Sequence, residues 1–314
     1  MRENLEFGSN PGNLGMHAFV PDDLAHSSAL VVALHGGQQS ADEYDQGAGW
    51  SALARQHGFA VLYPEQRGEN NSQNCFNWFN EKDIQREEGE VASIRAMIKK
   101  MLLDHNLDPN RIFVTGLSAG GAMACALLAA YPSLFSGGAV IAGLPYRAAL
   151  GTFDAFIAMS FAPGRSAKEW GDLVRQESPG QTIWPRISVW HGTRDDIVSP
   201  ANGSALVRQW IDLHQVDEAG AVEDEIDGQT RLSWRNAAGT VVVEHYVIDG
   251  MAHGVPVKEA AGFARAPSPF VLEAGISSTF HIAKSWGLLR QEPVMTAGPG
   301  KRRGALRAGP AATL

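Results

Sequence analysis

The chain has 314 residues, of which 44% are hydrophobic, 19% are charged and 34 are glycine, and its formal net charge is −8. Apolar content at this level excludes a wholly disordered chain, because it allows a core of ordinary size. The acidic balance, with a pI near 5.7, excludes nucleic acid as a main partner, since phosphate binding needs a basic surface.

Short apolar runs alternate with helical patterns, which is typical of a mainly parallel sheet flanked by helices. The expected strands are 16–20, 29–34, 60–63, 111–115, 139–142, 187–190 and 241–248. Helical spacing over 91–102 predicts a helix with one buried face, and the apolar run 119–131 predicts a buried helix. Early and late hairpins are expected to add antiparallel strands, the late one joining 230–234 to 241–248 through a turn.

This pattern predicts one α/β domain over residues 1–290. The apolar residues of an insert at 146–184 fit either a small lid or an ordinary packing helix. Residues 291–314 are rich in Gly, Ala, Pro and basic residues without periodicity, which predicts a disordered tail.

Targeting and redox signals are mostly absent from the sequence. The N-terminal segment has no apolar core of a secretory signal, and no run approaches the roughly 18 apolar residues of a membrane helix. Cys75 and Cys125 form no disulfide framework or zinc-like cluster. We therefore expect a cytoplasmic protein without a membrane partner, secretion being the alternative if the N-terminus was trimmed.

The strongest local motif is Gly116-Leu117-Ser118-Ala119-Gly120, which follows a predicted strand and opens a predicted helix. This context is typical of a nucleophilic serine held on a sharp, strained turn, where only small neighbours fit. The alternative is that Ser118 is only an N-cap residue. We predict that Ser118 is a nucleophile.

A serine nucleophile needs a base, and the histidine is expected last in chain order. His253 fits best, because it lies in a glycine-bounded loop just after the last predicted strand. His245 lies within that strand and His281 in the expected C-terminal helix, so both are interpreted as structural. The remaining alternative is that His253 is a surface loop residue.

The acid that orients the base is expected between the serine and the histidine in chain order, directly after a strand. Asp195 and Asp196 follow the strand that ends near Trp190. Adjacent side chains point in different directions, so one faces the imidazole and the other faces solvent or caps a helix. We favour Asp195 as the acid.

The third requirement is a pair of backbone N–H donors for the developing oxyanion. The amide of Ala119, directly after the nucleophile, is one candidate. The other lies in the loop His35-Gly36-Gly37-Gln38, where glycine lets the backbone approach a substrate closely. Gly37 is preferred, with Gly36 or Gln38 as alternatives, and His35 is expected to fix the turn by hydrogen bonding.

In these motifs and several others, the chain resembles the polyhydroxybutyrate depolymerase family of esterases, which are α/β-hydrolases related to feruloyl and acetylxylan esterases. The resemblance covers about 7–286 and rests on LHGGQ at 34–38, GFAVLYPE at 58–65, NWF at 77–79, TGLSAGG at 115–121, AGLPY at 142–146, WHGT at 190–193 and the final Gly-x-x-His. It implies an α/β-hydrolase fold with helices on both faces of the sheet. It also implies a triad of Ser118, Asp195 and His253.

One departure from the family is informative. Relatives often carry a cysteine where this chain has Gly37, paired with one at the position of Cys75. The resemblance therefore implies that Cys75 has lost its partner, which fits a reducing compartment and leaves the 66–80 loop without that link.

The 66–80 loop is rich in asparagine and long enough to suggest a binding role. Its Phe76, Trp78 and Phe79 either line a pocket, since aromatic faces suit ester chains and rings, or anchor the loop to the core. Trp78 and Phe76, with Gln38, are the predicted substrate contacts.

The leading hypothesis is a serine carboxylic-ester hydrolase that acts through an acyl-enzyme on hydroxybutyrate oligomers or similar small esters. A feruloyl or acetylxylan esterase is the alternative, and an acyltransferase with the same triad is a second one. The mechanism requires no cofactor or metal. The expected partner is a small or oligomeric ester, and the oligomeric state is left open.

Overall fold

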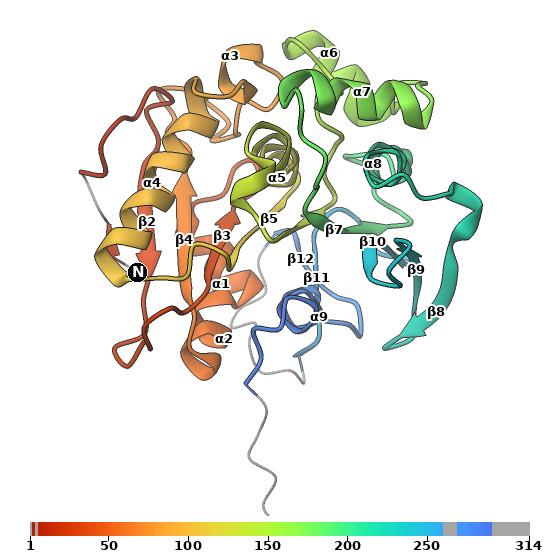
Figure 1. The fold of residues 1–314 in the computed structure, drawn as a ribbon. Helices are drawn as coiled ribbons and strands as arrows, with labels where there is room; N and C mark the ends of the chain where they lie inside the picture. The colour runs from red at the N-terminus through yellow and green to blue at the C-terminus, as the bar shows by residue number, and fades with distance from the viewer. Residues whose placement is uncertain (1, 4–5, 260–268, 291–314) are drawn as a thin grey trace, which may run out of the picture.

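The computed structural model describes residues 2–3, 6–259 and 269–290, and within them ten strands form one large sheet (Figure 1). In spatial order the strands are β1 (Arg2–Glu3), β2 (Gly15–Phe19), β4 (Ala60–Glu65), β3 (Leu30–Leu34), β5 (Ile112–Leu117), β6 (Gly137–Ile141), β7 (Arg186–Gly192), β10 (Val241–Ile248), β9 (Gln229–Arg235) and β8 (Val222–Ile226). A second small sheet pairs β11 (Val255–Val257) with β12 (Val271–Glu273) in parallel.

The six central strands from β4 to β10 run parallel, and both edges of the sheet are antiparallel. The prediction of a mainly parallel sheet is confirmed. The prediction of a late antiparallel hairpin, between β9 and β10, is also confirmed. Strand β8 is not among the predicted strands. Its Glu223, Asp224 and Glu225 are exposed on the sheet edge, so the apolar pattern used to find strands is missing there.

Helices cover both faces of the sheet (Figure 1). One face carries α1 (Ala41–Ala48), α2 (Trp50–His57) and α9 (Ser278–Ser285). The other carries α3 (Glu81–Ile84), α4 (Gly89–His105), α5 (Ala119–Ala130), α6 (Thr152–Ser160), α7 (Ala167–Glu177) and α8 (Ala201–Leu213). The resulting α/β arrangement with helices on both faces is the predicted fold class.

Alternation along the strands divides the apolar core in two. In β3, Leu30 and Val32 belong to the core under α4 and α5, whereas Val31 and Ala33 belong to the core under α1 and α9. Successive side chains of a strand point to opposite faces, so an all-apolar strand supplies both cores. This explains why the five residues of β3 are all buried.

Helix α5 is buried along its whole length, as its composition predicts, and it lies next to β5 and β6 at the centre of the sheet. Helix α1 begins with a capping box formed by Ser40 and Glu43 and ends at Gly49, whose φ is 77°. In the part of the chain that is described, no helix has the length and apolar character needed to cross a membrane.

The insert at 146–184 contains α6 and α7. The interpretation of its apolar residues as an ordinary packing helix is wrong for Phe153, Phe156, Ile157 and Phe161, because all four are exposed. Whether the insert moves as a lid stays a prediction. The predicted tail at 291–314 lies outside the described residues.

Candidate active site

The Gly-x-Ser-x-Gly segment forms a sharp turn between β5 and α5, with Ser118 at its apex. Ser118 has a φ of 55° and a ψ of −117°, a conformation that residues other than glycine rarely adopt. A Cβ on Gly116 would lie 2.4 Å from the Gly120 carbonyl carbon. One on Gly120 would lie 2.4 Å from the Leu34 carbonyl oxygen. Both glycines are therefore steric requirements of the turn.

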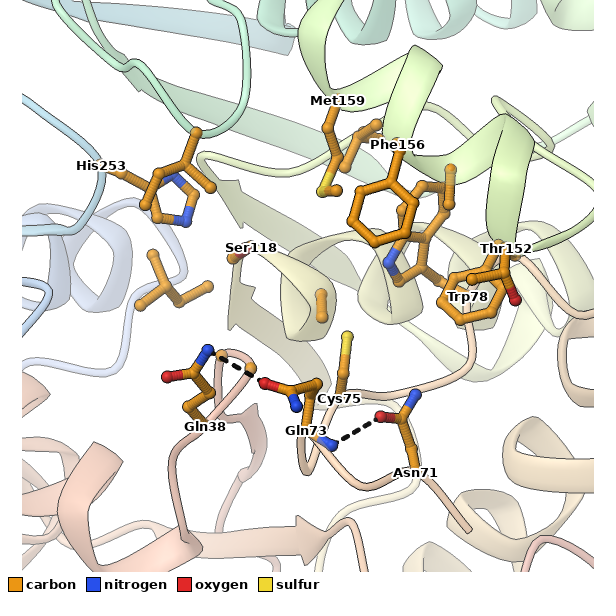
Figure 2. Close-up of a pocket in the computed structure, with 18 of the residues that line it drawn as sticks. Gln38, Asn71, Gln73, Cys75, Trp78, Ser118, Thr152, Phe156, Met159 and His253 are labelled. Atoms are coloured by element: carbon orange, nitrogen blue, oxygen red, sulfur yellow. Dashed lines mark hydrogen bonds between the residues drawn. The ribbon is translucent and has the colours of Figure 1, made fainter. Parts of the chain in front are cut away.

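Ser118 occupies the N-cap position of α5, but its side chain makes no capping hydrogen bond, so the alternative that it is only a capping residue does not hold. Its backbone N–H donates to the Ile141 carbonyl at 2.8 Å, which ties the turn to β6. Ser118 and His253 line the same cavity, and the His253 ring is turned toward Ser118 (Figure 2). The structure thus brings together two residues that the sequence places far apart.

Asp195 contacts His253 directly. The His253 Nδ1 donates to Asp195 Oδ2 at 2.7 Å, and both side chains are almost fully buried. With Nδ1 donating, Nε2 of a neutral ring is an acceptor. Asp196 is exposed, so of the two adjacent carboxylates only Asp195 faces the imidazole.

Four further hydrogen bonds hold the acid loop against the histidine loop. Thr193 N donates to Ile248 O at 3.0 Å and Arg194 N to Met251 O at 3.0 Å. The Thr193 hydroxyl donates to an Asp249 carboxylate oxygen and accepts from the backbone N–H of the following glycine. The loops approach so closely that a Cβ on Gly192 would lie 2.2 Å from Met251 O. The relative position of acid and base is therefore set by backbone contacts together with the Thr193 hydroxyl.

Asp195 is held in its ionised form. Its Oδ1 accepts from the backbone N–H of Ile197 at 3.0 Å and of Val198 at 2.8 Å. Burial alone would raise the pKa of the Asp195 carboxyl, but the hydrogen bonds from His191, His253 and Val198 outweigh burial and hold that pKa well below its usual range. The carboxylate therefore stays charged over any working pH.

His191 is the contact to Asp195 that sequence reasoning missed. Its Nε2 lies 3.2 Å from Asp195 Oδ2 and 2.9 Å from Val198 O, and its side chain is 2% exposed. His191 stands in the Trp190-His191-Gly192-Thr193 motif, which contributed only to the family resemblance. Hydrophobic periodicity does not indicate that a buried histidine at the end of a strand contacts the acid.

The three candidates for the second oxyanion donor differ in what their amides contact. The Gly36 N–H donates to Gln39 Oε1 at 2.9 Å, and the Gln38 N–H donates to Gln73 O at 2.7 Å. No described residue accepts a hydrogen bond from the Gly37 amide. Ala119 is the first residue of α5, so its amide has no acceptor within the helix. Gly37 and Ala119 both line the cavity with Ser118.

The cavity has a volume of about 470 Å³ and two kinds of wall (Figure 2). One wall is apolar and includes Trp78, Phe156 and Met159. The other is formed by amides, with Gln38, Asn71 and Gln73 linked by hydrogen bonds. Among the described residues that line the cavity, none is Asp, Glu, Lys or Arg, so the cavity fits an uncharged ligand.

The predicted substrate contacts separate into two groups. Trp78 and Gln38 line the cavity. Phe76 does not, because it is fully buried in the core and its ring lies 4.8 Å from that of His35. The Trp78 N–H donates to Phe76 O at 2.9 Å, and this tight turn sends the two aromatic side chains in different directions. His35 itself donates from Nδ1 to Gly36 O and accepts from Gln66 N, as a turn-fixing role requires.

A buried carboxyl holds the 66–80 loop in place. Glu90 of α4 is 0% exposed and accepts from Gln66 Nε2 at 2.5 Å, from Asn77 N at 2.9 Å and from Asn77 Nδ2 at 2.8 Å. Burial, reinforced by the charge of Asp83, raises the pKa of Glu90 to about 8 although these donors favour the carboxylate. Sequence reasoning missed this residue, because a Glu in an amphipathic helix is normally exposed.

The loop is tied down without a disulfide. Both cysteines are free. A Cβ on Gly37 would lie 3.8 Å from the Cβ of Cys75, which is the spacing of a disulfide. A cysteine at position 37 could therefore pair with Cys75, as the family resemblance implied, but glycine at this position supplies no thiol. In this chain the hydrogen bonds to Glu90 hold the same loop.

Comparison with known proteins points to the same class of enzyme. Residues 16–232 match the family model described as Esterase PHB depolymerase. The chain is 41% identical over 286 residues to poly(3-hydroxyalkanoate) depolymerase C of Paucimonas lemoignei, a match that covers 90% of this chain and 69% of that protein. It is 33% identical over 257 residues to the acetylxylan esterase of Coprinopsis cinerea, covering 80% of this chain and 68% of that protein.

The feruloyl esterase B of Neurospora crassa is 30% identical over 269 residues, covering 82% of this chain and 89% of that protein. The solved acetyl xylan esterase from Aspergillus awamori superposes with a TM-score of 0.74 at 23% identity, covering 84% of this chain and 97% of that chain, and so shows the same fold. The fold is that of the α/β-hydrolase esterases. The chain therefore belongs to the PHB depolymerase family of esterases, which hydrolyse carboxylic esters.

Proposed function

We propose that this esterase hydrolyses uncharged esters through an acyl-enzyme on Ser118, with His253 as general base and acid and Asp195 as the carboxylate that orients it. The observation that carries the proposal is the strained Ser118 turn facing the buried His253–Asp195 pair across one cavity. A serine hydroxyl becomes nucleophilic only when such a base is in reach.

In the first half of the reaction His253 Nε2 takes the Ser118 proton as Oγ attacks the ester carbonyl. The negative charge that develops on the carbonyl oxygen is stabilised by the amides of Gly37 and Ala119. His253 then gives the proton to the leaving alcohol. In the second half it activates water, which releases the acid and restores Ser118.

We propose short-chain hydroxyalkanoate esters, such as hydroxybutyrate oligomers, as the substrate class. The uncharged lining supports an ester bond inside a chain rather than one next to a free carboxylate, which would need a cation. The amide wall offers donors for further ester carbonyls. A feruloyl or acetyl ester of a polysaccharide is the second candidate, because Trp78 and Phe79 would also suit a ring.

The test of the mechanism is Ser118→Ala, with p-nitrophenyl butyrate as the substrate. We expect kcat to fall by at least about 10⁴-fold with an unchanged circular dichroism spectrum. Ser133→Ala, an exposed serine outside the cavity, is the matched control and should keep full activity. Retained turnover in Ser118→Ala would contradict the mechanism.

The test of substrate class compares kcat/KM for a methyl-esterified hydroxybutyrate trimer, methyl ferulate and acetylated xylan. The highest value is expected for the trimer, and preference for either of the others would replace the proposed class. We also propose a cytoplasmic location, supported by the two free cysteines, which fractionation of the source cells would check.

A further inference from the structure

Large apolar side chains on the surface gather around one helix. Nine large hydrophobic residues are exposed among the residues that the structure describes, and five of them lie in the short segment 150–161 that contains α6. They are Leu150, Phe153, Phe156, Ile157 and Phe161, and three of them are 64–76% exposed. We call this surface the α6 ridge. Single exposed apolar residues are ordinary, but a cluster of aromatic ones marks a contact surface.

The ridge forms one face because of its helical spacing. Phe153, Phe156 and Ile157 stand at i, i+3 and i+4, which places them side by side on α6. The opposite side of the helix buries Ala155 and Ala158 in the core. The helix is thus fixed by two small residues while its large residues face solvent, the reverse of an ordinary surface helix.

The ridge is continuous with the cavity that contains Ser118. Phe156 is 64% exposed and also lines that cavity, and Met159 reaches into it from the next turn of α6 (Figure 2). Ile197, 44% exposed, lines the same cavity. In Figure 1 α6 stands at the outer edge of the molecule. An extended apolar partner lying on the ridge would therefore meet the mouth of the cavity.

The charges around the ridge favour an uncharged partner. Asp154 is the one charged residue in 150–163. The nearest basic side chains are engaged: Arg147 pairs with Glu81, and Arg165 lies over the Trp170 ring with 4.6 Å to its centroid. An anionic lipid surface is bound through clusters of free Lys and Arg, which the described ridge does not present.

A second copy of the chain is a poor fit as the permanent partner. Because Phe156 and Ile197 line the cavity, a copy seated on the ridge would obstruct the mouth through which the ester must enter. An uncharged polyester needs no basic residues on the ridge. It also does not compete with the substrate for the cavity mouth, since its own ester bonds are the substrate.

We propose that the α6 ridge is a docking surface for water-insoluble, uncharged aliphatic polyester, which it holds against the mouth of the cavity. This inference rests on the proposed function and extends it from soluble esters to the polymer surface. The aromatic side chains adsorb to the polymer, and a chain segment at the edge of the ridge enters between Phe156 and Ile197.

The test measures adsorption separately from hydrolysis. Binding to polyhydroxybutyrate particles is measured by depletion from the supernatant on a Ser118→Ala background, so that the particles are not consumed. Phe153→Ser with Phe161→Ser removes two ridge residues, 76% and 75% exposed, that do not line the cavity. Leu103→Ser with Ile183→Ser, 73% and 80% exposed elsewhere, is the matched control.

We expect adsorption of the ridge variant to weaken by at least about tenfold, since burial of one aromatic side chain is worth that factor. The control should adsorb like the parent. With Ser118 restored, kcat/KM of the ridge variant for p-nitrophenyl butyrate should stay within about twofold of that of the parent.

Unchanged adsorption of the ridge variant, or an equal loss in the control, would overturn the proposal. So would ridge-dependent capture by phosphatidylcholine or phosphatidylglycerol vesicles that exceeds capture by the polymer, or ridge-dependent dimerisation in sedimentation. If the parent adsorbs through the ridge but turns over no ester, the proposed function fails while the docking surface stands.

Discussion

Asp195 shows how much of the site depends on single atoms. Its Oδ2 receives His253 Nδ1 and lies 3.2 Å from His191 Nε2, and its Oδ1 receives two backbone amides. Every lone pair direction of the carboxylate is therefore used. The group cannot rotate without breaking several contacts, so the His253 ring has one stable orientation.

Asp195→Asn tests whether the charge of the carboxylate is needed in addition to its shape. The amide keeps the shape but removes the charge and can present a donor to His253, which favours the tautomer with Nδ1 as acceptor. We expect kcat for p-nitrophenyl butyrate to fall by about 10⁴-fold, with only a small change in the urea concentration at the unfolding midpoint. Asp196→Asn, one residue away and exposed, should leave kcat unchanged. Equal losses in the two variants would show that Asp195 is not the orienting acid.

Residue types and loop context predicted where the chemistry lies, but not every contact within it. Gly116, Gly120 and Gly192 are needed for steric reasons, so they mark the site in the sequence. The roles of Phe76 and Trp78 were not predictable, because the turn between them is set by a single backbone hydrogen bond. Glu90 and His191 were missed because burial of a polar residue depends on partners that are distant in sequence.

At the scale of elements, α4 and the 66–80 loop act as a unit through Glu90. The loop carries Trp78 and Gln73 of the cavity wall, whereas Glu90 lies at the start of a helix whose other buried residues are mostly apolar. The position of the cavity wall therefore depends on a polar contact inside the core.

This contact makes stability depend on pH. The folded-state pKa of Glu90 is about 8, above the roughly 4.3 of an unfolded chain, so between these values the folded state binds a proton that the unfolded state releases. The contribution of Glu90 to the free energy of unfolding therefore falls as pH rises from about 5 to 8.

Glu90→Gln removes the titration. We expect the variant to gain stability relative to the parent as pH rises, by at most about 1.4 kcal/mol per pH unit, in urea unfolding at pH 5.5 and 8. Glu69→Gln, an exposed residue of the same loop, should follow the parent at both values. A constant difference between Glu90→Gln and the parent would mean that Glu90 does not titrate in this range.

At the scale of the whole molecule, the C-terminal helix closes the core on one face of the sheet. The Trp286 ring directly after α9 stacks on Phe113 of β5 with centroids 4.7 Å apart and on Trp50 of α2 at 5.9 Å. The Thr279 hydroxyl of α9 donates to Ala48 O at the end of α1. The first and last parts of the domain are thus joined behind the strand that presents Ser118.

Trp286→Ala should destabilise the protein by about 3–5 kcal/mol, because the cavity left among aromatic rings cannot collapse easily. Urea unfolding followed by fluorescence measures the change. Lys284→Ala, exposed on the same helix, is the control and should change stability by less than about 0.5 kcal/mol. A comparable loss in both variants would assign the effect to the helix and not to the ring stack.

The overall architecture was largely predictable, since apolar strands such as β3 and the wholly apolar α5 leave a clear pattern. The stacking of Trp286 on Phe113 and Trp50 was not predictable, because residues separated by more than half of the chain leave no periodic pattern in the sequence. The exposure of the α6 ridge was not predictable either, since composition does not tell which face of an apolar helix meets the core.

The α6 ridge also bears on colloidal behaviour. An aromatic surface that adheres to an apolar solid adheres to its own copies unless something keeps the molecules apart, and here that is the net charge of −8. Near pH 5.7 this charge vanishes, and the ridges of neighbouring molecules can meet. Solubility should therefore pass through a minimum near that pH, so the surface suited to an insoluble substrate also limits the concentration at which the enzyme stays dispersed.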